Sequence, residues 1–337
     1  MPGSRITHFY NEHTVEQAAC HIASGGLVVF PTETVYGLGA DARNDEACKA
    51  IFVAKGRPAD NPLIVHIHSL DQLDECAVHV PDIALRLFSA FSPGPLTIVL
   101  PKAKGISPTV SAGLNTVGIR IPAHPLAQRF LAAAACPLAA PSANISGKNS
   151  PSTYEMAVAS MNGRVDGIID GGDCTVGLES TVIGLFENRF RILRPGAITA
   201  EMIIDLFQNP NVFASVAGGF ELEAHKPASP GMKYTHYKPV ADVYLIPPGV
   251  EMIAVHDRLH AKRIGCIGIA GELGPDDGKS IRYEFSNLAE YARNLYKTFF
   301  ELDQAGCDCI IAQLPESSGL GLALLDRLEK AAAGKRI

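Results

Sequence analysis

The sequence of 337 residues contains no tryptophan, and only 7% of its side chains are aromatic and 19% are charged. It has no apolar stretch of membrane-spanning length, and its first residues, 1–5, lack the apolar core of a signal peptide. We therefore expect a cytoplasmic protein that makes no membrane contact. The hydrophobic residues, 47% of the total, are sufficient for sizeable cores, and the length suggests two domains.

The eight cysteines include no C-x-x-C pair. The nearest two, Cys307 and Cys309, alternate with Asp308 on an expected strand and so share one face. This spacing supports neither a zinc site nor a disulfide framework, so we expect buried free thiols and no metal held by protein side chains.

The formal net charge is −6, and no segment of the chain is basic overall. A protein that holds tRNA stably is expected to show a basic stripe, so no stable binding of nucleic acid is predicted. A fold can still gather dispersed charges into a patch. The basic residues of the first half favour a local site for a small anion.

Hydroxyl, glycine and basic residues are concentrated between residues 31 and 66. An apolar strand expected at 27–30 precedes them, so Thr32 and Thr34 follow the end of a strand, where α/β sheets commonly bind ligands. Lys55 and Arg57 place two positive charges in a loop rich in glycine and proline, which suits phosphate. A solvated turn is the structural alternative, and further polar segments downstream weigh against it.

Four further polar segments follow along the chain. In the segment 111–122, Thr116 and Arg120 lie four residues apart on an expected strand, hence on one face. The segment 139–150 is dense in hydroxyl and amide groups, and polar residues recur at 170–183 and 191–196.

Taken in order, these segments resemble the Sua5/YrdC/YwlC family, and in particular its long, two-domain Sua5-type members. The matching motifs are PTETVYGL, KGRP, NPLIVH, PGPLT, PSAN, ESTV and RPG, between roughly residues 12 and 200, followed by SPGMKYTHY at 229–237. The resemblance implies synthesis of threonylcarbamoyl-AMP and pyrophosphate from L-threonine, bicarbonate and ATP. In this family the product serves the N6-threonylcarbamoyladenosine modification of position 37 in ANN-decoding tRNAs, so we expect it to pass to a tRNA threonylcarbamoyltransferase complex.

The resemblance also implies roles for individual residues. Lys55 and Arg57 are the expected catalytic residues, which neutralise charge on the triphosphate. The ATP site is expected to comprise Arg57, Asn61, Thr116, Ser142, Ser150, Arg194 and Tyr234. The threonine site is expected to comprise Thr34, His66, Arg120, Ala140 and Ser180. Mg²⁺ is expected to arrive with ATP, bound mainly by phosphate and water, because the sequence shows no clustered carboxylates.

Some of these residues have structural alternatives. His66, considered alone, is more often a satisfied structural histidine, and Ser142 could serve as a turn or cap residue. Glu33 and Glu179 could be acids of the pocket, but neither their spacing nor a partner fixes a role.

The expected fold is α/β. We predict a YrdC-like catalytic domain at 1–208 with a twisted open sheet, a linker at 209–239, and a smaller Rossmann-like domain at 240–337. The linker holds Lys233, Tyr234, His236 and Tyr237, which are too polar and aromatic for a spacer, so we expect it to cover the site as a lid; a passive tether is the alternative. The expected helices lie at 14–26, 45–53, 82–91, 125–135, 251–260, 288–304 and 320–332. The expected strands include 27–30, 96–100, 167–170, 240–246, 263–269 and 308–313.

Two motif-like segments are better explained structurally. Residues 147–150 lack the Ser or Thr after lysine that a P-loop requires, and 319–321 fit a closely packed helix start better than a dinucleotide site. Two other classes of protein stay open: an RNA-binding module, and a carbamoyl-adenylate transferase of the hydrogenase-maturation type. The second normally carries zinc-finger regions, for which this chain has no matching cysteine spacing.

Overall fold

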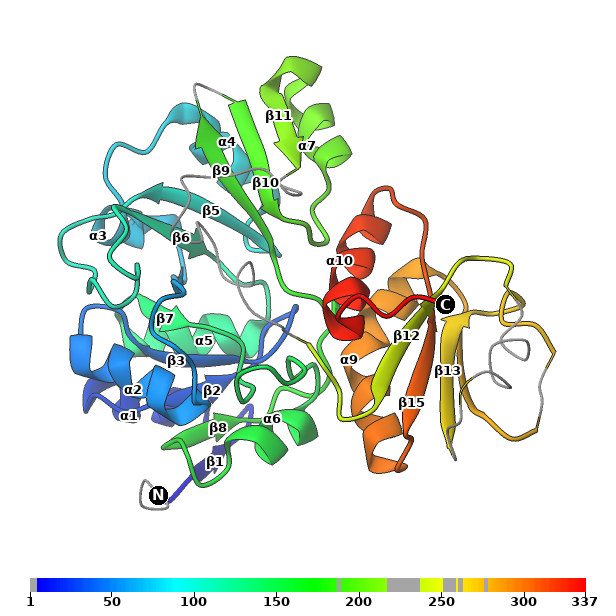
Figure 1. The fold of residues 1–337 in the computed structure, drawn as a ribbon. Helices are drawn as coiled ribbons and strands as arrows, with labels where there is room; N and C mark the ends of the chain where they lie inside the picture. Colours follow the sequence, from blue (N-terminus) through cyan, green and yellow to red (C-terminus); the bar gives the residue numbers. More distant parts are fainter. Residues whose placement is uncertain (1–4, 187–188, 217–236, 251–258, 260–262, 276–277) are drawn as a thin grey trace.

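The structure is a computed structural model that describes residues 5–186, 189–216, 237–250, 259, 263–275 and 278–337. These residues form two units, each built on its own sheet. Figure 1 shows the larger unit, with the N-terminus, beside the smaller unit, with the C-terminus. Among the described residues, no helix is long and apolar enough to cross a membrane.

The larger unit contains an 11-stranded mixed sheet in the order β1-β8-β2-β3-β7-β4-β6-β5-β9-β10-β11. Its strands are β1 (His8–Tyr10), β2 (Val28–Phe30), β3 (Gly37–Asp41), β4 (Ile64–His66), β5 (Leu96–Pro101), β6 (Thr116–Arg120), β7 (Leu138–Ala140), β8 (Gly167–Ile169), β9 (Thr181–Phe186), β10 (Arg189–Arg194) and β11 (Phe213–Val216). Parallel and antiparallel pairs are mixed: β4 is parallel to β6 and antiparallel to β7.

Helices cover this sheet, and apolar side chains beneath them form its cores. The helical elements are η1 (Val15–Ala18), α1 (Ala19–Ala23), α2 (Asp45–Lys55), η2 (Leu70–Gln72), α3 (Leu73–Cys76), α4 (Asp82–Phe91), α5 (Pro125–Ala134), α6 (Tyr154–Met161), α7 (Ala200–Phe207) and η3 (Pro210–Val212). The predicted α/β class with a twisted sheet is confirmed.

The smaller unit contains a four-stranded, fully parallel sheet in the order β12-β15-β13-β14. Its elements are β12 (Asp242–Ile246), β13 (Ile264–Ile269), β14 (Ile281–Phe285), α9 (Leu288–Gln304), β15 (Cys309–Gln313) and α10 (Leu320–Ala332). In Figure 1, α9 and α10 lie between this sheet and the larger unit. Side chains of both helices contact the larger unit: Lys297 of α9 pairs with Asp173, and Arg327 of α10 pairs with Glu179.

One hydrophobic cluster contains residues from both units. Val35 and Leu178 of the larger unit belong to the same buried cluster as Tyr296, Phe299 and Leu324 of α9 and α10. Burial of such apolar area is the main force that holds packed elements together. The two units thus have a shared apolar contact.

Several expectations need correction. The helix expected at 14–26 is shorter: it consists of η1 and α1, and Thr14 makes no capping bond through its side chain. Residues 210–216, expected as the start of the linker, form η3 and β11, and β11 pairs with β10. Most of the predicted linker, including Tyr234, lies outside the described residues, as does the predicted helix at 251–260 apart from residue 259. The domain limits stay a prediction.

All eight cysteines are free thiols. Seven are buried as expected, whereas Cys20 is exposed. Burial raises the pKa of the Cys309 thiol to about 12, which keeps it protonated and unreactive.

Candidate active site

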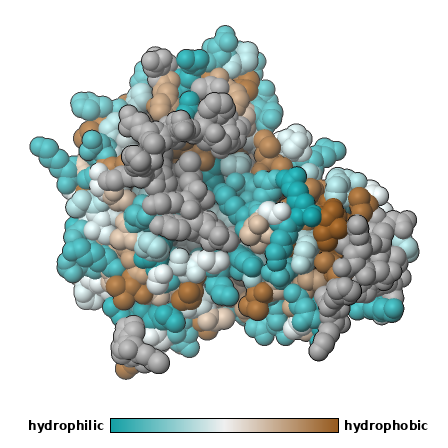
Figure 2. Space-filling model, in the orientation of Figure 1, coloured by the Kyte–Doolittle hydropathy of each residue, from teal (hydrophilic) through white to brown (hydrophobic). Residues whose placement is uncertain are grey.

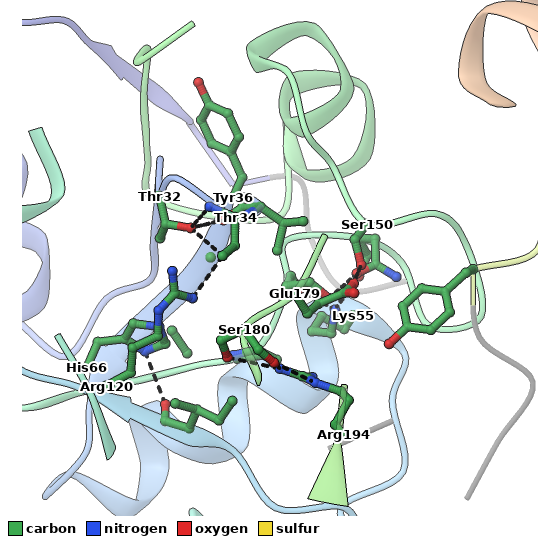
Figure 3. A pocket seen from close by; sticks show the side chains of 18 of the residues that line it. Thr32, Thr34, Tyr36, Lys55, His66, Arg120, Ser150, Glu179, Ser180 and Arg194 are labelled. Carbon is green, nitrogen blue, oxygen red and sulfur yellow. Dashed lines mark hydrogen bonds between the residues drawn. The ribbon is translucent and has the colours of Figure 1, made fainter. Parts of the chain in front are cut away.

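A pocket lies in the larger unit where the ends of several strands meet the loop after β2, the start of β9 and the end of β10. Figure 3 shows polar and charged side chains converging on it, and Figure 2 shows hydrophilic side chains gathered on the surface near the boundary between the units. The lining residues are Thr32, Thr34, Val35, Tyr36, Gly37, Lys55, Arg57, Ile64, His66, Arg120, Ala140, Pro141, Ser142, Asn144, Ser146, Ser150, Glu179, Ser180, Arg194 and Tyr237.

Helix α2 delivers the first two cations. It begins at Asn44, whose side chain accepts a hydrogen bond from the amide of Ala47, and it ends at Gly56, which has a φ of 59°. Glycine adopts this left-handed conformation without the steric cost that a side chain would add. Lys55 occupies the last helical position and Arg57 follows Gly56, and both side chains line the pocket.

Lys55 is buried, with an exposed fraction of 2%, and has no carboxylate within bonding distance in the described contacts. Its Nζ instead donates to the carbonyl oxygens of Ser142 and Asn144, each at 2.5 Å, and lies 3.3 Å from Asn144 Oδ1. Burial and the charge of Arg57 lower the pKa of Lys55. The three acceptors around Nζ favour the protonated form instead, because an ammonium group has three N–H donors. An anion bound here would complete the neutralisation of this charge.

His66 and Arg120 lie side by side because β4 and β6 pair in parallel with these two residues as partners. Both side chains are buried. Arg120 Nη2 lies 2.8 Å from Glu33 Oε1, Nη1 donates to Thr34 Oγ1 at 2.8 Å, and Nε donates to the Gly94 carbonyl at 3.3 Å. These contacts fix the plane of the guanidinium group.

His66 is neutral at physiological pH. Burial, together with the charge of Arg120, lowers its pKa to about 3. Its Nδ1 lies 3.3 Å from the carbonyl oxygen of Ile64, and because a carbonyl only accepts, Nδ1 carries the proton. The other ring nitrogen, Nε2, is therefore a hydrogen-bond acceptor.

The donor and acceptor roles of the Thr34 hydroxyl group are fixed as well. Thr32 Oγ1 donates to the carbonyl of Val35 at 2.6 Å, so Thr34, 2.8 Å away, must donate to Thr32. Thr34 Oγ1 also accepts from Arg120. Its remaining capacity is that of an acceptor, like Nε2 of His66.

Arg194 lies at the end of β10 and points back to the start of β9. Its guanidinium donates to the carbonyl of Ser180 at 3.1 and 2.9 Å and to Ser180 Oγ at 3.1 Å. Gly196 permits this close approach, because a Cβ at that position would lie 2.7 Å from Thr181 Oγ1 and 2.8 Å from the Glu179 carbonyl. The Arg-Pro-Gly motif is thus needed for close packing against residues 179–181.

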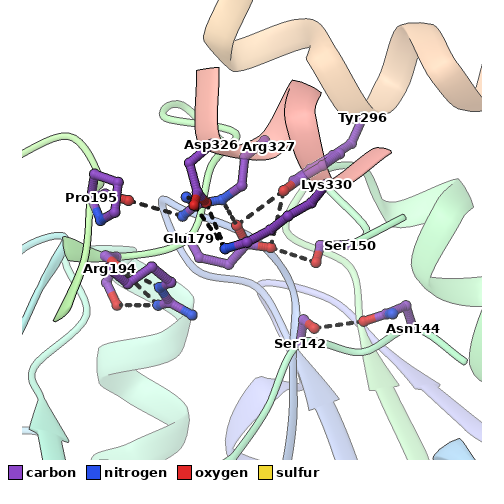
Figure 4. Close-up of polar contacts among 11 residues, drawn as sticks. Ser142, Asn144, Ser150, Glu179, Arg194, Pro195, Tyr296, Asp326, Arg327 and Lys330 are labelled. Atoms are coloured by element: carbon purple, nitrogen blue, oxygen red, sulfur yellow. Dashed lines mark hydrogen bonds and ion pairs between the residues drawn. The ribbon is translucent and has the colours of Figure 1, made fainter. Parts of the chain in front are cut away.

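Ser150 and Glu179 connect the pocket to the smaller unit. Ser150 Oγ donates to Glu179 Oε1 at 2.6 Å, and Glu179 Oε2 accepts from Arg327 Nε at 2.8 Å and from the Tyr296 hydroxyl at 3.0 Å. Burial opposes ionisation of Glu179, but Arg327 and Arg194 outweigh it, and its pKa is lowered to about 2. Figure 4 shows these side chains converging from α9, α10 and the loop before β9.

Ten of the thirteen predicted site residues line the pocket. They are Thr34, Lys55, Arg57, His66, Arg120, Ala140, Ser142, Ser150, Ser180 and Arg194. Tyr234 lies outside the described residues, and Asn61 and Thr116 do not line the pocket in this structure. The roles assigned to all of them stay predictions.

Asn61 and Thr116 differ in their distance from the pocket. Asn61 is buried beside Arg57, which donates to its carbonyl at 3.1 Å, and its side-chain oxygen and nitrogen have no hydrogen-bond partner among the described residues. Thr116 shares a strand face with Arg120 but begins β6, about 13 Å along the strand. The two-residue period predicted the face correctly and gave no information on this separation.

The sequence reasoning missed Tyr36 and Asn144, considered Tyr237 only as part of the linker, and left Glu179 without a role. Thr32 also lines the pocket, at the strand end where ligand groups were expected. Tyr36 and Asn144 lie inside motifs that had been recognised, so their positions offered a signal. Tyr237 and Glu179 also lie inside recognised motifs, but their contacts with the smaller unit involve residues far away in the sequence, which no motif predicts.

Comparisons with known proteins cover nearly the whole chain. Residues 20–196 match the family model of Sua5, YciO and YrdC proteins that is described as "Telomere recombination", and residues 198–333 match "Threonylcarbamoyl-AMP synthase, C-terminal domain". The threonylcarbamoyl-AMP synthases of Pyrococcus abyssi and Bacillus subtilis are each 42% identical to this chain. Each alignment covers 97% of this chain, and it covers 96% of the P. abyssi protein and 95% of the B. subtilis protein. The crystal structure of P. abyssi Sua5 complexed with L-threonine superposes with a TM-score of 0.88, at 39% identity and 99% coverage of both chains.

Proposed function

Because this chain belongs to the Sua5/YrdC/YwlC family, we propose that its pocket binds L-threonine, bicarbonate and ATP and forms threonylcarbamoyl-AMP and pyrophosphate. The observation that carries this proposal is the arrangement of two kinds of polar groups in one pocket. Lys55 and Arg57 form a cationic end, whereas Thr34 and His66 present acceptors beside the donors of Arg120.

The end of the pocket at Arg120 suits an amino acid. Arginine has five N–H donors, and the hydrogen bonds to Thr34 and Gly94 engage two of them, while Nη2 is ion-paired with Glu33. The remaining N–H groups are available for a carboxylate. Thr34 Oγ1 and His66 Nε2 are acceptors and therefore match the ammonium group. Ser180, whose Oγ lies 2.7 Å from Thr97 Oγ1, is placed to contact the substrate hydroxyl, and Ala140 to contact its methyl group.

The end of the pocket at Lys55 and Arg57 suits a triphosphate. A guanidinium group binds phosphate oxygens through charge-assisted hydrogen bonds, and Lys55, whose three donors already face protein acceptors, adds its positive charge. Ser142 Oγ donates to Asn144 Oδ1 at 2.5 Å, so it can offer a nucleotide only acceptor capacity. Ser150 and Arg194 complete the nucleotide contacts that we propose, and the unpartnered amide of Asn61 could join them when ATP binds.

In the reaction, bicarbonate loses water to give CO2, and the threonine amine attacks its carbon and releases a proton, which forms the carbamate. The carbamate oxygen then attacks the α-phosphorus, and the β,γ-pyrophosphate leaves. Arg57 and Lys55 stabilise the charge that develops on the phosphate oxygens, and the pocket holds the reactants together. No covalent intermediate with the protein is needed.

Magnesium enters this proposal as part of the Mg–ATP substrate. The described residues contain no cluster of three or more His, Cys, Asp or Glu that could hold a metal ion. Glu179 accepts from Ser150 and Arg327, and Glu33 contacts Arg120 and the amide of Ala123. These engagements fit an ion bound mainly by phosphates and water, as Mg²⁺ often is.

The labile product would be passed in the cytoplasm to a tRNA threonylcarbamoyltransferase complex, for the modification of adenosine 37 in ANN-decoding tRNAs. The formal net charge of −6 agrees with a protein that does not itself hold tRNA. A role as an RNA-binding module would instead give ATP-independent affinity for RNA that falls steeply with salt. The match of residues 198–333 to a synthase C-terminal domain disfavours the hydrogenase-maturation alternative.

Incubation of the purified protein with ATP, L-threonine and ¹⁴C-bicarbonate tests the proposal. Label should appear in threonylcarbamoyl-AMP, with one pyrophosphate released per product, and omission of threonine should abolish both signals. Release of pyrophosphate without labelled adenylate, or no reaction at all, would contradict the assignment.

A further inference from the structure

A buried arginine of the smaller unit reaches into the wall of the pocket. Arg327, on α10, has an exposed fraction of 0%, and it donates to Glu179 Oε2 at 2.8 Å, to Asp326 at 2.6 Å and to the Pro195 carbonyl at 3.0 Å. A buried charge is costly unless it is paired and hydrogen-bonded. The three contacts, two of them to the larger unit, meet this requirement.

Glu179 in turn determines what Ser150 can offer a ligand. The carboxylate is ionised and can only accept, so the proton of Ser150 Oγ must lie on the 2.6 Å bond to Glu179 Oε1. Ser150 therefore faces the pocket as an acceptor. Such a group matches a ribose hydroxyl or the exocyclic amine of adenine, and it does not match a phosphate oxygen.

Tyr296 supports the same carboxylate from α9. Its hydroxyl lies 3.0 and 3.3 Å from the two oxygens of Glu179, and its ring stacks on that of Tyr237, with the centroids 5.5 Å apart. Figure 4 shows Tyr296 and Arg327 approaching Glu179 from the two helices. Side chains of α9 and α10 thus hold one carboxylate of the pocket.

We propose that Arg327 is a positioning residue for the nucleoside part of ATP: it fixes Glu179, which orients the Ser150 hydroxyl as an acceptor for a nucleoside donor group. This inference rests on the proposed function for the identity of the nucleotide. Tyr296 contributes to the same task. Arg327 and Tyr296 thus complete the nucleotide site although neither is among the residues that line the pocket.

The structural alternative is that Arg327 only joins the two units. The two roles differ in which ligand they affect. The amino-acid end of the pocket is organised by Arg120, Glu33 and Thr34, all from the larger unit, and none of them contacts Arg327 in the described bonds. A positioning role therefore predicts a selective loss of ATP affinity, whereas loss of a joining contact affects both ligands or neither.

Three variants and a control separate these cases. Arg327→Lys keeps the charge but loses the branched donor geometry, and Tyr296→Phe removes only the hydroxyl and keeps the stacked ring. Ser150→Ala removes the group that is positioned. Lys297→Met is the control, because it breaks another ion pair between the units, Lys297 with Asp173 at 2.8 Å, whose side chains are 38% and 55% exposed.

Binding of ATP and of L-threonine is measured separately by calorimetry on the full chain. Arg327→Lys should weaken ATP binding roughly 10-fold and Tyr296→Phe roughly 3-fold, as expected for the loss of hydrogen bonds to a charged group, while threonine affinity stays within about twofold. The control should bind both ligands as the wild type does. In the Ser150→Ala background, Arg327→Lys should change ATP affinity less than about twofold, because Arg327 is proposed to affect ATP only through the Ser150 hydroxyl.

Several results would overturn the inference: wild-type ATP affinity in both Arg327→Lys and Tyr296→Phe, equal losses for ATP and threonine, or full additivity with Ser150→Ala. Should Arg327→Lys fail to fold, Tyr296→Phe decides alone. A wild-type chain that binds ATP but forms no threonylcarbamoyl-AMP would refute the proposed function and leave this binding comparison valid.

Discussion

The buried, neutral His66 should make the stability of this protein sensitive to mild acid. In the folded state its pKa is lowered to about 3 by burial and by Arg120. An imidazole in the unfolded chain titrates near about 6.5. As the pH falls below that value, the unfolded state binds a proton that the folded state cannot take up until about pH 3, so the free energy of unfolding decreases.

The magnitude follows from the linkage relation. Between pH 7.5 and pH 5.5, protonation of His66 in the unfolded chain alone costs about 1.4 kcal/mol of stability, because one pKa unit corresponds to about 1.36 kcal/mol. This value does not depend on the folded-state pKa as long as that pKa stays below about 4.5. In His66→Gln this contribution disappears.

Urea unfolding, followed by far-ultraviolet circular dichroism because the chain has no tryptophan, measures the effect at both pH values. The wild type should lose about 1.4 kcal/mol more than His66→Gln over this interval, whatever the offset between the two proteins at pH 7.5. His13→Gln is the matched control, since that side chain is 82% exposed, and it should follow the wild type. If the free energies of unfolding of the wild type and of His66→Gln change equally between the two pH values, His66 is not buried in its neutral form.

Three further outcomes are expected of the synthase reaction. Arg57→Ala should lower the rate of pyrophosphate release by roughly one to two decades, because it removes a charge-assisted phosphate contact of about 1.5 to 3 kcal/mol; an unchanged rate, in a protein with unaltered circular dichroism, removes Arg57 from the site. In competition assays valine should be rejected strongly, since it leaves the groups around Ser180 and Thr34 unpaired, whereas serine should lose only about 1 to 3 kcal/mol for its missing methyl group. Comparable turnover of valine speaks against that pocket assignment. Removal of Mg²⁺ with EDTA should abolish adenylate formation but leave the circular dichroism spectrum unchanged, because the proposed ion comes with ATP; unfolding by EDTA would indicate a structural metal instead.

Much of the site could be predicted because its residues lie in short, local patterns. Lys55 and Arg57 flank Gly56, which ends α2, and the helix end itself directs both side chains to the pocket. His66 and Arg120 each close an apolar strand, and the parallel pairing of β4 with β6 brings them together. The motifs of a known family supplied the roles, which periodicity alone could not have given.

Other parts could not be predicted from local patterns. The strand face predicted for Thr116 is correct, but Thr116 and Arg120 lie at opposite ends of β6. The pairing of β11 with β10 could not be predicted, because the segment from 209 to 239 is rich in proline and glycine and shows little periodicity. The polarity of each hydroxyl also depends on partners: Thr34 is an acceptor because Thr32 and Arg120 surround it.

The sequence by itself determined the fold class, the family, and the polar segments that make up the pocket, because hydrophobic periodicity, turn residues and ordered motifs are written locally along the chain. The tertiary structure decided the protonation and donor state of those groups. Glu179 and Arg327 are 148 positions apart in sequence, and no pattern predicts that they meet. Their contact exists because α10 packs against the larger unit. Both charges are buried there, and a buried charge is costly unless it is paired with an opposite charge.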